Sequence, residues 1–444
     1  MGCQGCRHYL IHLFKSRRVL LVLVIISLFA TEAFLSMWTG LGYDMKVWFQ
    51  TGVWMNQGTN IYLPNDHLGY PPLWAFWCLA SYRVFNVLGN NMEIWRFTLK
   101  LPLILAQFAL AFAIGKFAAK RFDSQTAQKI FLVSLTWIFF IYIGALWGQL
   151  NTLSAMLTFL AFYAATSRRT IVGAVLLGLS ITLKIFPLIT LPAFAAFIWK
   201  NRSKKETGRF LLFTGAVPAV FTFAVFAAYQ WDILYFFKTV FYWAPVFDVN
   251  PVQMHGGGMN IWSFLSLVNV EISQVSLLRF IWIPLLAIAA IYWFRKPKMN
   301  EENLNLSIIS FNALFILSYA WVPEQSFLDL LPFVFLQIFG YRTKRLYIFL
   351  LVIVQLLVFT FSAFNWGPFI FEPLLTQFSP ATLQSIQFLD PSKSSSVWAI
   401  RGVIGLAVSV SLAVFLLALV KPEIFEKLKH FPRKSTLKEN HMTD

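Results

Sequence analysis

The chain has 444 residues, of which 58% are hydrophobic, 18% are aromatic and only 12% are charged. So little charge cannot cover a water-soluble surface, which excludes a soluble globular protein and indicates a polytopic membrane protein. The formal net charge of +17 could suggest a nucleic-acid partner, but the basic residues stand in short loops between apolar runs and in both tails. Basic residues in such places orient a membrane protein, so we expect no nucleic acid.

The first apolar run, from Val19 to Trp38, follows Arg17 and Arg18 and has no small-residue cleavage signature. It therefore predicts a retained membrane anchor. Further apolar runs are long enough for helices that cross a hydrocarbon core of roughly 30 Å, and we expect an all-α protein with about twelve transmembrane helices. We place the crossings at residues 18–38, 96–118, 129–147, 150–166, 171–184, 186–199, 209–230, 276–294, 304–321, 326–340, 345–365 and 399–420.

This arrangement puts most of the 36 lysine and arginine residues on the face that holds both termini, which predicts that this face is cytoplasmic. If the apolar segment 71–89 also crossed the membrane, every later loop would change sides. We therefore expect this segment to be re-entrant or to lie along the outer surface. Residues 39–70 and 231–262 are then outer loops of a single domain, 1–420, and residues 421–444 form a basic cytoplasmic tail.

A second irregularity is the apolar run 171–199, which is interrupted at Lys184-Ile185-Phe186-Pro187. Proline removes an amide donor and disfavours helix in the residue before it. Two short helices that meet at Lys184 would explain the pattern and keep the basic loops on both sides of the run inside. Lys184 is then expected at the outer side, partly buried.

The predicted outer loops hold nearly all of the unusual polar residues. They are Asp44, Asp66, His67 and Tyr70 in the first loop, then Gln149, Asn151 and Lys184, then His255 and Asn260, and last Glu324 and Gln325. These side chains come from separate parts of the chain, so a common site on the outer face would need the helices to bring them together.

Several short motifs run through the chain in a fixed order. After the early Asp44 they are Gly58-Thr59-Asn60-Ile61-Tyr62, Tyr70-Pro71-Pro72-Leu73, Gly148-Gln149-Leu150-Asn151 and the segment from Gly178 to Pro187. In this order they resemble the GT-C superfamily of membrane glycosyltransferases. The resemblance is to the polyprenyl-phosphate-mannose-dependent branch, which includes the bacterial phosphatidylinositol-mannoside mannosyltransferases, and more distantly to the GPI mannosyltransferase I catalytic subunit.

One departure from the family concerns metal binding. The GPI enzyme has a D-x-D in its first loop, whereas this chain has Tyr43-Asp44-Met45-Lys46, without a second acid two residues on. The single aspartate is more similar to the bacterial lipid-linked members. We therefore predict no cofactor and no obligatory divalent metal ion.

The resemblance implies an inverting transfer, which needs a base for the acceptor hydroxyl and cations or donors for the leaving phosphate. Asp44 suits the catalytic base, and Lys184 and His255 suit the donor phosphate. Substrate-binding roles fall to Tyr70, Gln149, Asn151, Asn260, Glu324 and Gln325.

Each assignment has a structural alternative. Asp44 could cap a short surface helix, Asp66 is a weaker candidate for the base in a probable turn sequence, and Lys184 could extend to the membrane interface. His255 could be incidental in its glycine-rich loop. Gln149, Asn151, Glu324 and Gln325 could cap helices.

The sequence thus predicts an integral cell-membrane glycosyltransferase with its site on the extracytoplasmic side. It would transfer a hexose, with mannose favoured, from a polyprenyl-phosphate sugar to a lipid-linked or glycolipid acceptor. A secondary transporter or lipid-linked-sugar flippase is the alternative, although related halves and mid-membrane polar groups are not evident in the sequence. A non-catalytic subunit of a glycosyltransferase complex is a third possibility, in which Asp44 would be dispensable.

Overall fold

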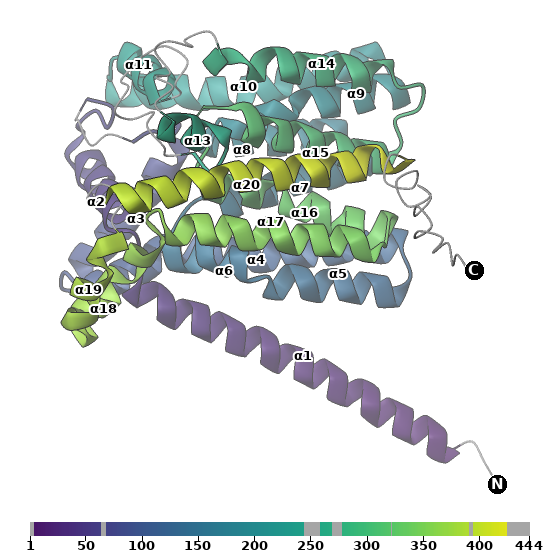
Figure 1. The fold of residues 1–444 in the computed structure, drawn as a ribbon, viewed down its shortest axis with the longest axis horizontal. Coiled ribbons are helices and arrows are strands. Elements are labelled where there is room, and N and C mark those ends of the chain that lie inside the picture. Colours follow the sequence, from purple (N-terminus) through teal and green to yellow (C-terminus); the bar gives the residue numbers. More distant parts are fainter. Residues whose placement is uncertain are drawn as a thin grey trace, which may run out of the picture.

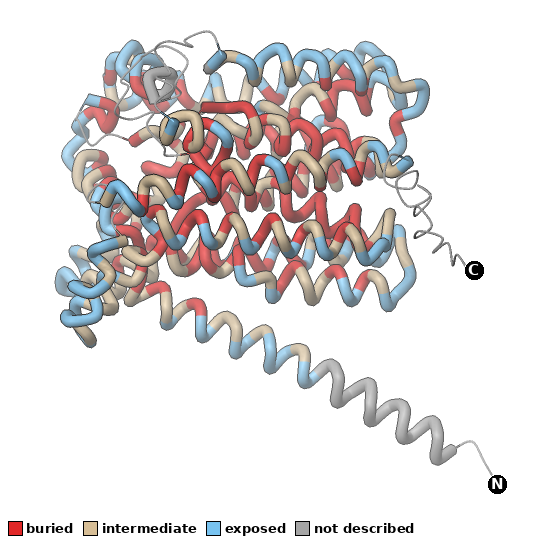
Figure 2. Tube along the Cα trace, viewed as in Figure 1, coloured by how far each residue is buried: buried red, intermediate tan, exposed pale blue. Residues whose placement is uncertain are grey.

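The computed structural model describes residues 4–63, 68–243, 258–268, 278–320, 322–389 and 394–423. Within these ranges all regular secondary structure is helical. The long helices lie alongside one another in a bundle (Figure 1), and the buried residues fill the space between them (Figure 2). The structure is therefore that of an all-α protein, as the composition predicts.

Within the described ranges, six helical segments are long and apolar enough to cross a membrane. They are the part of α1 (Gln4–Trp38) from Val19 on, α4 (Met92–Arg121), the segment from α5 (Ser124–Thr136) through α6 (Ile138–Ile141) and η1 (Tyr142–Trp147), α10 (Lys204–Tyr229), α17 (Arg345–Ala363) and α20 (Ser395–Val420). These segments show an integral membrane protein by their length and composition.

Shorter elements complete the bundle and its ends. Within the bundle lie α7 (Asn151–Thr166), α8 (Thr170–Leu183), η2 (Phe186–Thr190), α9 (Leu191–Asn201), η3 (Leu278–Phe280), α14 (Trp282–Arg295), α15 (Glu301–Ser318), η4 (Glu324–Asp329), α16 (Leu331–Phe335) and η5 (Leu336–Tyr341). Toward one end lie α2 (Gly42–Gln57), α3 (Leu73–Val87), α11 (Ile233–Trp243), α13 (Ile261–Leu267), η6 (Gly367–Phe371), α18 (Glu372–Phe378), α19 (Pro380–Ile386) and η7 (Gln387–Leu389). In the part of each predicted crossing that the structure describes, the chain is mainly helical, but the number of twelve spans stays a prediction.

The predicted break at Lys184 is present. Helix α8 ends at Leu183, Lys184 has extended backbone angles, and the 3-10 turn η2 leads into α9. At the far ends of this helix pair, the Arg202 guanidinium donates to the Ala165 carbonyl over 3.1 Å. The pair therefore goes into the bundle and returns to the same end, as the sequence predicts.

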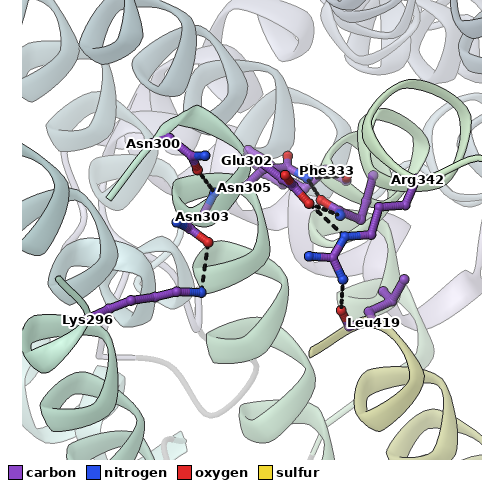
Figure 3. A network of polar contacts seen from close by, with 9 residues as sticks. Lys296, Asn300, Glu302, Asn303, Asn305, Phe333, Arg342 and Leu419 are labelled. Atoms are coloured by element: carbon purple, nitrogen blue, oxygen red, sulfur yellow. Dashed lines mark hydrogen bonds and ion pairs between the residues drawn. The ribbon is translucent and has the colours of Figure 1, made fainter. Parts of the chain in front are cut away.

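Basic residues gather at that end, which we call the basic end, where Arg121, Arg202, Lys296, Arg342 and Lys421 lie. Arg121 pairs with Glu301 at 2.6 Å and Arg342 with Glu302 at 2.7 Å. Arg342 also donates to the Leu419 carbonyl, and Lys296 donates to Asn303 (Figure 3). These contacts join loops that are distant in sequence, so the structure brings predicted cytoplasmic loops together. Which side of a membrane they face stays a prediction.

The opposite end, which we call the site end, holds α2, α3, α11, α18 and α19 (Figure 1). A second hydrophobic core lies here, with Trp48, Trp74 and Trp95 fully buried among α2, α3 and the start of α4. Helices α2 and α3 approach closely because Gly52 has no side chain, and an added Cβ would lie 2.6 Å from the Cys78 carbonyl oxygen. This packing holds α2 in place, and α2 carries Asp44 in its first turn. Whether residues 71–89 enter the membrane stays a prediction.

Helix α1 leaves the bundle toward its N-terminal end (Figure 1), and its apolar side chains from Val19 on are largely exposed. The charged residue Glu32 within this run is instead fully buried, and it accepts a hydrogen bond of 2.9 Å from the Gln107 amide of α4. This contact helps to fix the end of α1 that leads into α2.

Candidate active site

Asp44 lies in the first turn of α2, half-buried at the site end. Its Oδ2 atom accepts two hydrogen bonds, from Trp147 Nε1 at 2.6 Å and from Gln149 Nε2 at 2.8 Å. The helix begins at Gly42 and its N-cap residue is Leu41, without a side-chain cap. The alternative that Asp44 serves as a helix cap is therefore wrong, since its carboxylate is directed to another part of the chain.

The surroundings of Asp44 alter its acidity. Burial raises the pKa of this carboxyl above its ordinary value, and the hydrogen bonds from Trp147 and Gln149 act in the opposite direction. A carboxylate with a raised pKa is a stronger base once it is ionised. Asp44 is thus held in place and is chemically suited to accept a proton.

The two donors to Asp44 come from an irregular helix end. Trp147 is the last residue of η1, a π-helical turn, and Gly148 follows in the left-handed region with φ of 89°. An added Cβ at Gly148 would lie 2.8 Å from Met45 Cε, so glycine serves both the backbone angle and the close approach of α2. Single π-helical turns are frequent at functional sites, and this one places Trp147 and Gln149 on either side of the bend.

Lys100 also stabilises the bend at Gly148. It was not among the residues predicted from the sequence. Its fully buried ammonium donates to the carbonyls of Thr39 at 2.7 Å, Leu146 at 2.9 Å and Ser36 at 3.2 Å. It therefore connects the end of α1 to η1. The available signal was a lysine directly before the long apolar stretch of this helix, since an ionisable residue there needs partners.

Tyr70 joins the site from the loop before α3. Its hydroxyl donates to Gln149 Oε1 over 3.5 Å, and its backbone carbonyl accepts a 3.0 Å bond from the Tyr62 hydroxyl. Burial raises the pKa of Tyr70, and the charges of Asp44 and Asp329 raise it further. Tyr70 therefore lies within electrostatic reach of two carboxylates that are 285 positions apart in the chain.

Asp329, which sequence reasoning also missed, ends the 3-10 turn η4. Its Oδ2 accepts a 3.0 Å hydrogen bond from Asn151 Nδ2 at the start of α7. Burial raises the pKa of Asp329 to about 6, against the effects of Lys184 and Asn151. No motif marks Asp329, which stands in an apolar run; its charge there was the only signal.

Lys184 lies just beyond the end of α8 and is 2% exposed. Its Nζ atom is buried without a hydrogen-bond partner and lies 4.7 Å from the centre of the Phe186 ring. Burial lowers the pKa of Lys184 to about 8, while the Asp329 carboxylate acts to raise it. The side chain does not extend to the surface, so the snorkelling alternative is wrong for Lys184.

Glu324 and Gln325 begin η4, directly after Pro323. Glu324 is fully buried and accepts hydrogen bonds from Ser362 at 3.0 Å and from Asn365 at 3.1 Å. Burial raises the pKa of Glu324, whereas hydrogen bonds from its own backbone amide, Ser362 and Asn365 and the charge of Arg401 lower it. Glu324 thus links η4 to the end of α17. Gln325 is 6% exposed, and its Oε1 atom has no partner.

Asn260 has a different environment. It caps α13 by accepting from the Trp262 amide, and its Nδ2 donates to the Ile316 and Tyr319 carbonyls at 2.8 Å each. Both ends of its amide are used within the protein, so we leave Asn260 out of the site proposed below. His255, Asp66 and His67 lie outside the described residues.

The structure therefore brings together Asp44, Tyr70, Gln149, Asn151 and Lys184 through hydrogen bonds and electrostatic contacts that include Trp147 and Asp329. Glu324 and Gln325 adjoin this group because they occupy the same short turn as Asp329. Among the described residues, no three histidine, cysteine or acidic side chains gather as they would around a metal ion. The absence of a metal requirement stays a prediction.

The sequence matches the family model described as glycosyltransferase family 87 over residues 69–322, which is more than half of the chain. The matched region includes Tyr70, Gln149, Asn151 and Lys184, whereas Asp44 and Asp329 lie on either side of it. No curated protein matches the chain.

Proposed function

Since the chain belongs to glycosyltransferase family 87, we propose that it is an inverting enzyme that transfers a hexose, with mannose favoured. The donor is a polyprenyl-phosphate sugar, and the acceptor is a lipid-linked or glycolipid molecule at the outer face of the cell membrane. The family supports a transferase and gives no support to the transporter alternative. The donor, the sugar, the acceptor and the side of the membrane are proposed here.

The observation that carries this proposal is the pairing of a held carboxylate with a buried, unpartnered ammonium at one end of the bundle. Asp44 accepts two hydrogen bonds on Oδ2, and Lys184 has a buried Nζ without a partner. Tyr70 and Asp329 connect the two electrostatically. A base and a cation in one site are what a displacement of a phosphate leaving group requires.

In the proposed reaction, Asp44 takes the proton of the acceptor hydroxyl. The hydroxyl oxygen then forms a bond to C1 of the hexose on the face opposite the phosphate. The bond between C1 and the phosphate oxygen breaks, and the polyprenyl phosphate leaves with the electron pair. Lys184 stabilises the charge on that phosphate, and Trp147 and Gln149 keep Asp44 in position. Proton, nucleophile and leaving group are thus all assigned.

Two features support a lipid-linked donor. The proposed site lies at the end of the bundle opposite the basic residues, and the positive-inside rule would put that end outside the cell, where cytosolic nucleotide sugars are not supplied. The sequence also contains no glycine-rich nucleotide loop and no soluble domain. A polyprenyl monophosphate would bring both the sugar and an anchor in the bilayer.

The test is transfer by the purified protein in liposomes from polyprenyl-phosphate mannose labelled with carbon-13 at C1, with glycolipid extract as the acceptor. We expect a mannosylated lipid whose anomeric configuration, read by NMR, is opposite to that of the donor. Retained configuration would contradict the mechanism. Movement of the labelled donor across the bilayer without any product would favour the transporter alternative.

A further inference from the structure

Two acidic side chains lie in the proposed site, and the mechanism above uses only Asp44. The second, Asp329, is held on one side by Asn151, which donates to Oδ2 over 3.0 Å. Its other oxygen, Oδ1, is buried and has no hydrogen-bond partner. A buried carboxylate oxygen without a donor is uncommon in a folded protein and calls for an explanation.

Two other buried polar groups near Asp329 also lack a hydrogen-bond partner. Asn151 is fully buried, and its Oδ1 atom also lacks a partner, because its Nδ2 is directed to Asp329. The Nζ atom of Lys184, 2% exposed, lacks one too. Two acceptor oxygens, of Asp329 and Asn151, and the ammonium of Lys184 are therefore buried here without a hydrogen-bond partner. A ligand that brings hydroxyl donors together with a negative charge would supply all three partners.

The position of Asp329 indicates which part of such a ligand it meets. The Asp329 charge acts on Lys184 and on Tyr70, and Asp44 acts on Tyr70 as well. Asp329 and Lys184 are therefore near enough for their charges to interact, and the proposed function puts the donor phosphate at Lys184. The group attached to that phosphate is the hexose to be transferred, so the hexose is the part of the donor within reach of Asp329.

We propose that Asp329 is a specificity-determining residue that accepts hydrogen bonds from hydroxyl groups of the donor hexose, with Asn151 as its positioning residue. This inference rests on the proposed function of the site. A carboxylate forms stronger, charge-assisted hydrogen bonds with hydroxyl groups than a neutral acceptor does. A site built around such a bond discriminates strongly against a sugar that lacks the hydroxyl, because the buried acceptor is then left without a donor.

The experiment compares wild type with Asp329→Asn on the full polyprenyl-phosphate hexose and on donors that lack one hydroxyl at C2, C3, C4 or C6. The matched control is Asp232→Asn, since Asp232 is an exposed aspartate at the site end whose side chain accepts a hydrogen bond from the Leu234 amide. We expect wild type to lose at least about tenfold in kcat/KM on one or more of the deoxy donors. On the full donor, kcat/KM of Asp329→Asn should be lower than that of wild type by a similar factor. On that same deoxy donor, kcat/KM of the variant should be almost the same as on the full donor.

The inference fails if Asp329→Asn lowers transfer from every donor by one common factor, which is the result expected for a residue with only a structural role. It also fails if Asp329→Asn leaves transfer from every donor unchanged. If wild type transfers no hexose from any polyprenyl phosphate, the proposed function itself fails, and that result is distinct from either outcome. Should Asp329→Asn not fold, Asn151→Ala tests the same point. Loss of its discrimination between full and deoxy donors supports the inference, and discrimination equal to wild type overturns it.

Discussion

The indole nitrogen of Trp147 lies 2.6 Å from Oδ2 of Asp44. This bond joins the last residue of the π-helical turn η1 to the first turn of α2, across 103 positions of sequence. It both orients the carboxylate and counteracts the rise in its pKa that burial causes. The irregular helix end is therefore part of the proposed base.

The first prediction concerns this bond. In Trp147→Phe the ring is kept but the donor is lost, so the pKa of Asp44 rises further and the carboxylate is less well oriented. The lost orientation should lower kcat by about tenfold or more, because a misplacement of about 1 Å can cost roughly 10²-fold in rate. The acid limb of the pH–rate profile should also move to higher pH, and steady-state transfer assays across pH measure both effects.

Trp231→Phe is the control for that experiment, because Trp231 also donates its indole N–H within the site end, to the Gly58 carbonyl at 2.9 Å. It should leave the acid limb where wild type has it. Equal shifts in the two variants would mean that the Trp147 bond has no particular effect on the base.

The second prediction is the pH dependence of wild type. Asp44 must be ionised to accept a proton, so kcat/KM should fall as pH drops below its raised pKa. Lys184 must be protonated to bind the phosphate, and burial lowers its pKa to about 8, so kcat/KM should also fall as pH rises above about 8. The profile of kcat/KM, which reports the free enzyme, is expected to be bell-shaped.

The alkaline limb can be assigned with the profile of kcat. A bound phosphate stabilises the charged form of Lys184, so the alkaline limb of kcat should lie at higher pH than that of kcat/KM. Lys184→Arg, which stays charged across this range, should remove the alkaline limb from kcat/KM if it binds donor at all. An unchanged limb in an active Lys184→Arg enzyme would assign it to another group.

The sequence predicted the helical class, the break at Lys184 and the grouping of Asp44, Tyr70, Gln149, Asn151 and Lys184. Apolar length, proline and the distribution of basic residues carry this information, because they report directly on the membrane and on backbone hydrogen bonding.

The partners of those residues could not be predicted in the same way. Trp147 and Asp329 were not among the candidate site residues, and Asp329 lies in an apolar run without a motif. Their roles depend on the π-helical turn at η1 and on the packing of η4 against α7, which are tertiary features. Asn260 shows the reverse case, since a polar residue in an outer loop proved to be a helix cap.

The third prediction concerns Lys100, which joins α1 to η1 through carbonyls of Ser36, Thr39 and Leu146. Lys100→Met would leave these buried acceptors without a donor, at about 1–3 kcal/mol for each. We expect a clear decrease in thermal stability in detergent and a loss of transfer, because the support of Trp147 is removed. Lys116→Met, an exposed position on the same helix, should change neither.

If Lys100→Met is as stable as the Lys116→Met control and fully active, then Lys100 does not support the bend at η1.

The fourth prediction is that metal removal has no effect. The Oδ2 atom of Asp44 already accepts two N–H donors, which leaves only Oδ1 for a cation, and the residue two positions on is Lys46 rather than a second acid. Transfer by protein treated with EDTA should equal that of untreated protein. Loss of transfer with EDTA, restored by Mg²⁺ or Mn²⁺, would contradict this prediction.

The central claim, that Asp44 is the catalytic base, is tested most directly by measuring hexose transfer and donor binding together in Asp44→Asn. Asparagine keeps the shape but cannot take the proton, and general-base catalysis contributes roughly 10²–10⁴-fold. We expect kcat to fall by that order while the affinity for polyprenyl-phosphate mannose stays within about threefold of wild type, because Lys184 binds the phosphate. Transfer by Asp44→Asn at the wild-type rate would contradict the account.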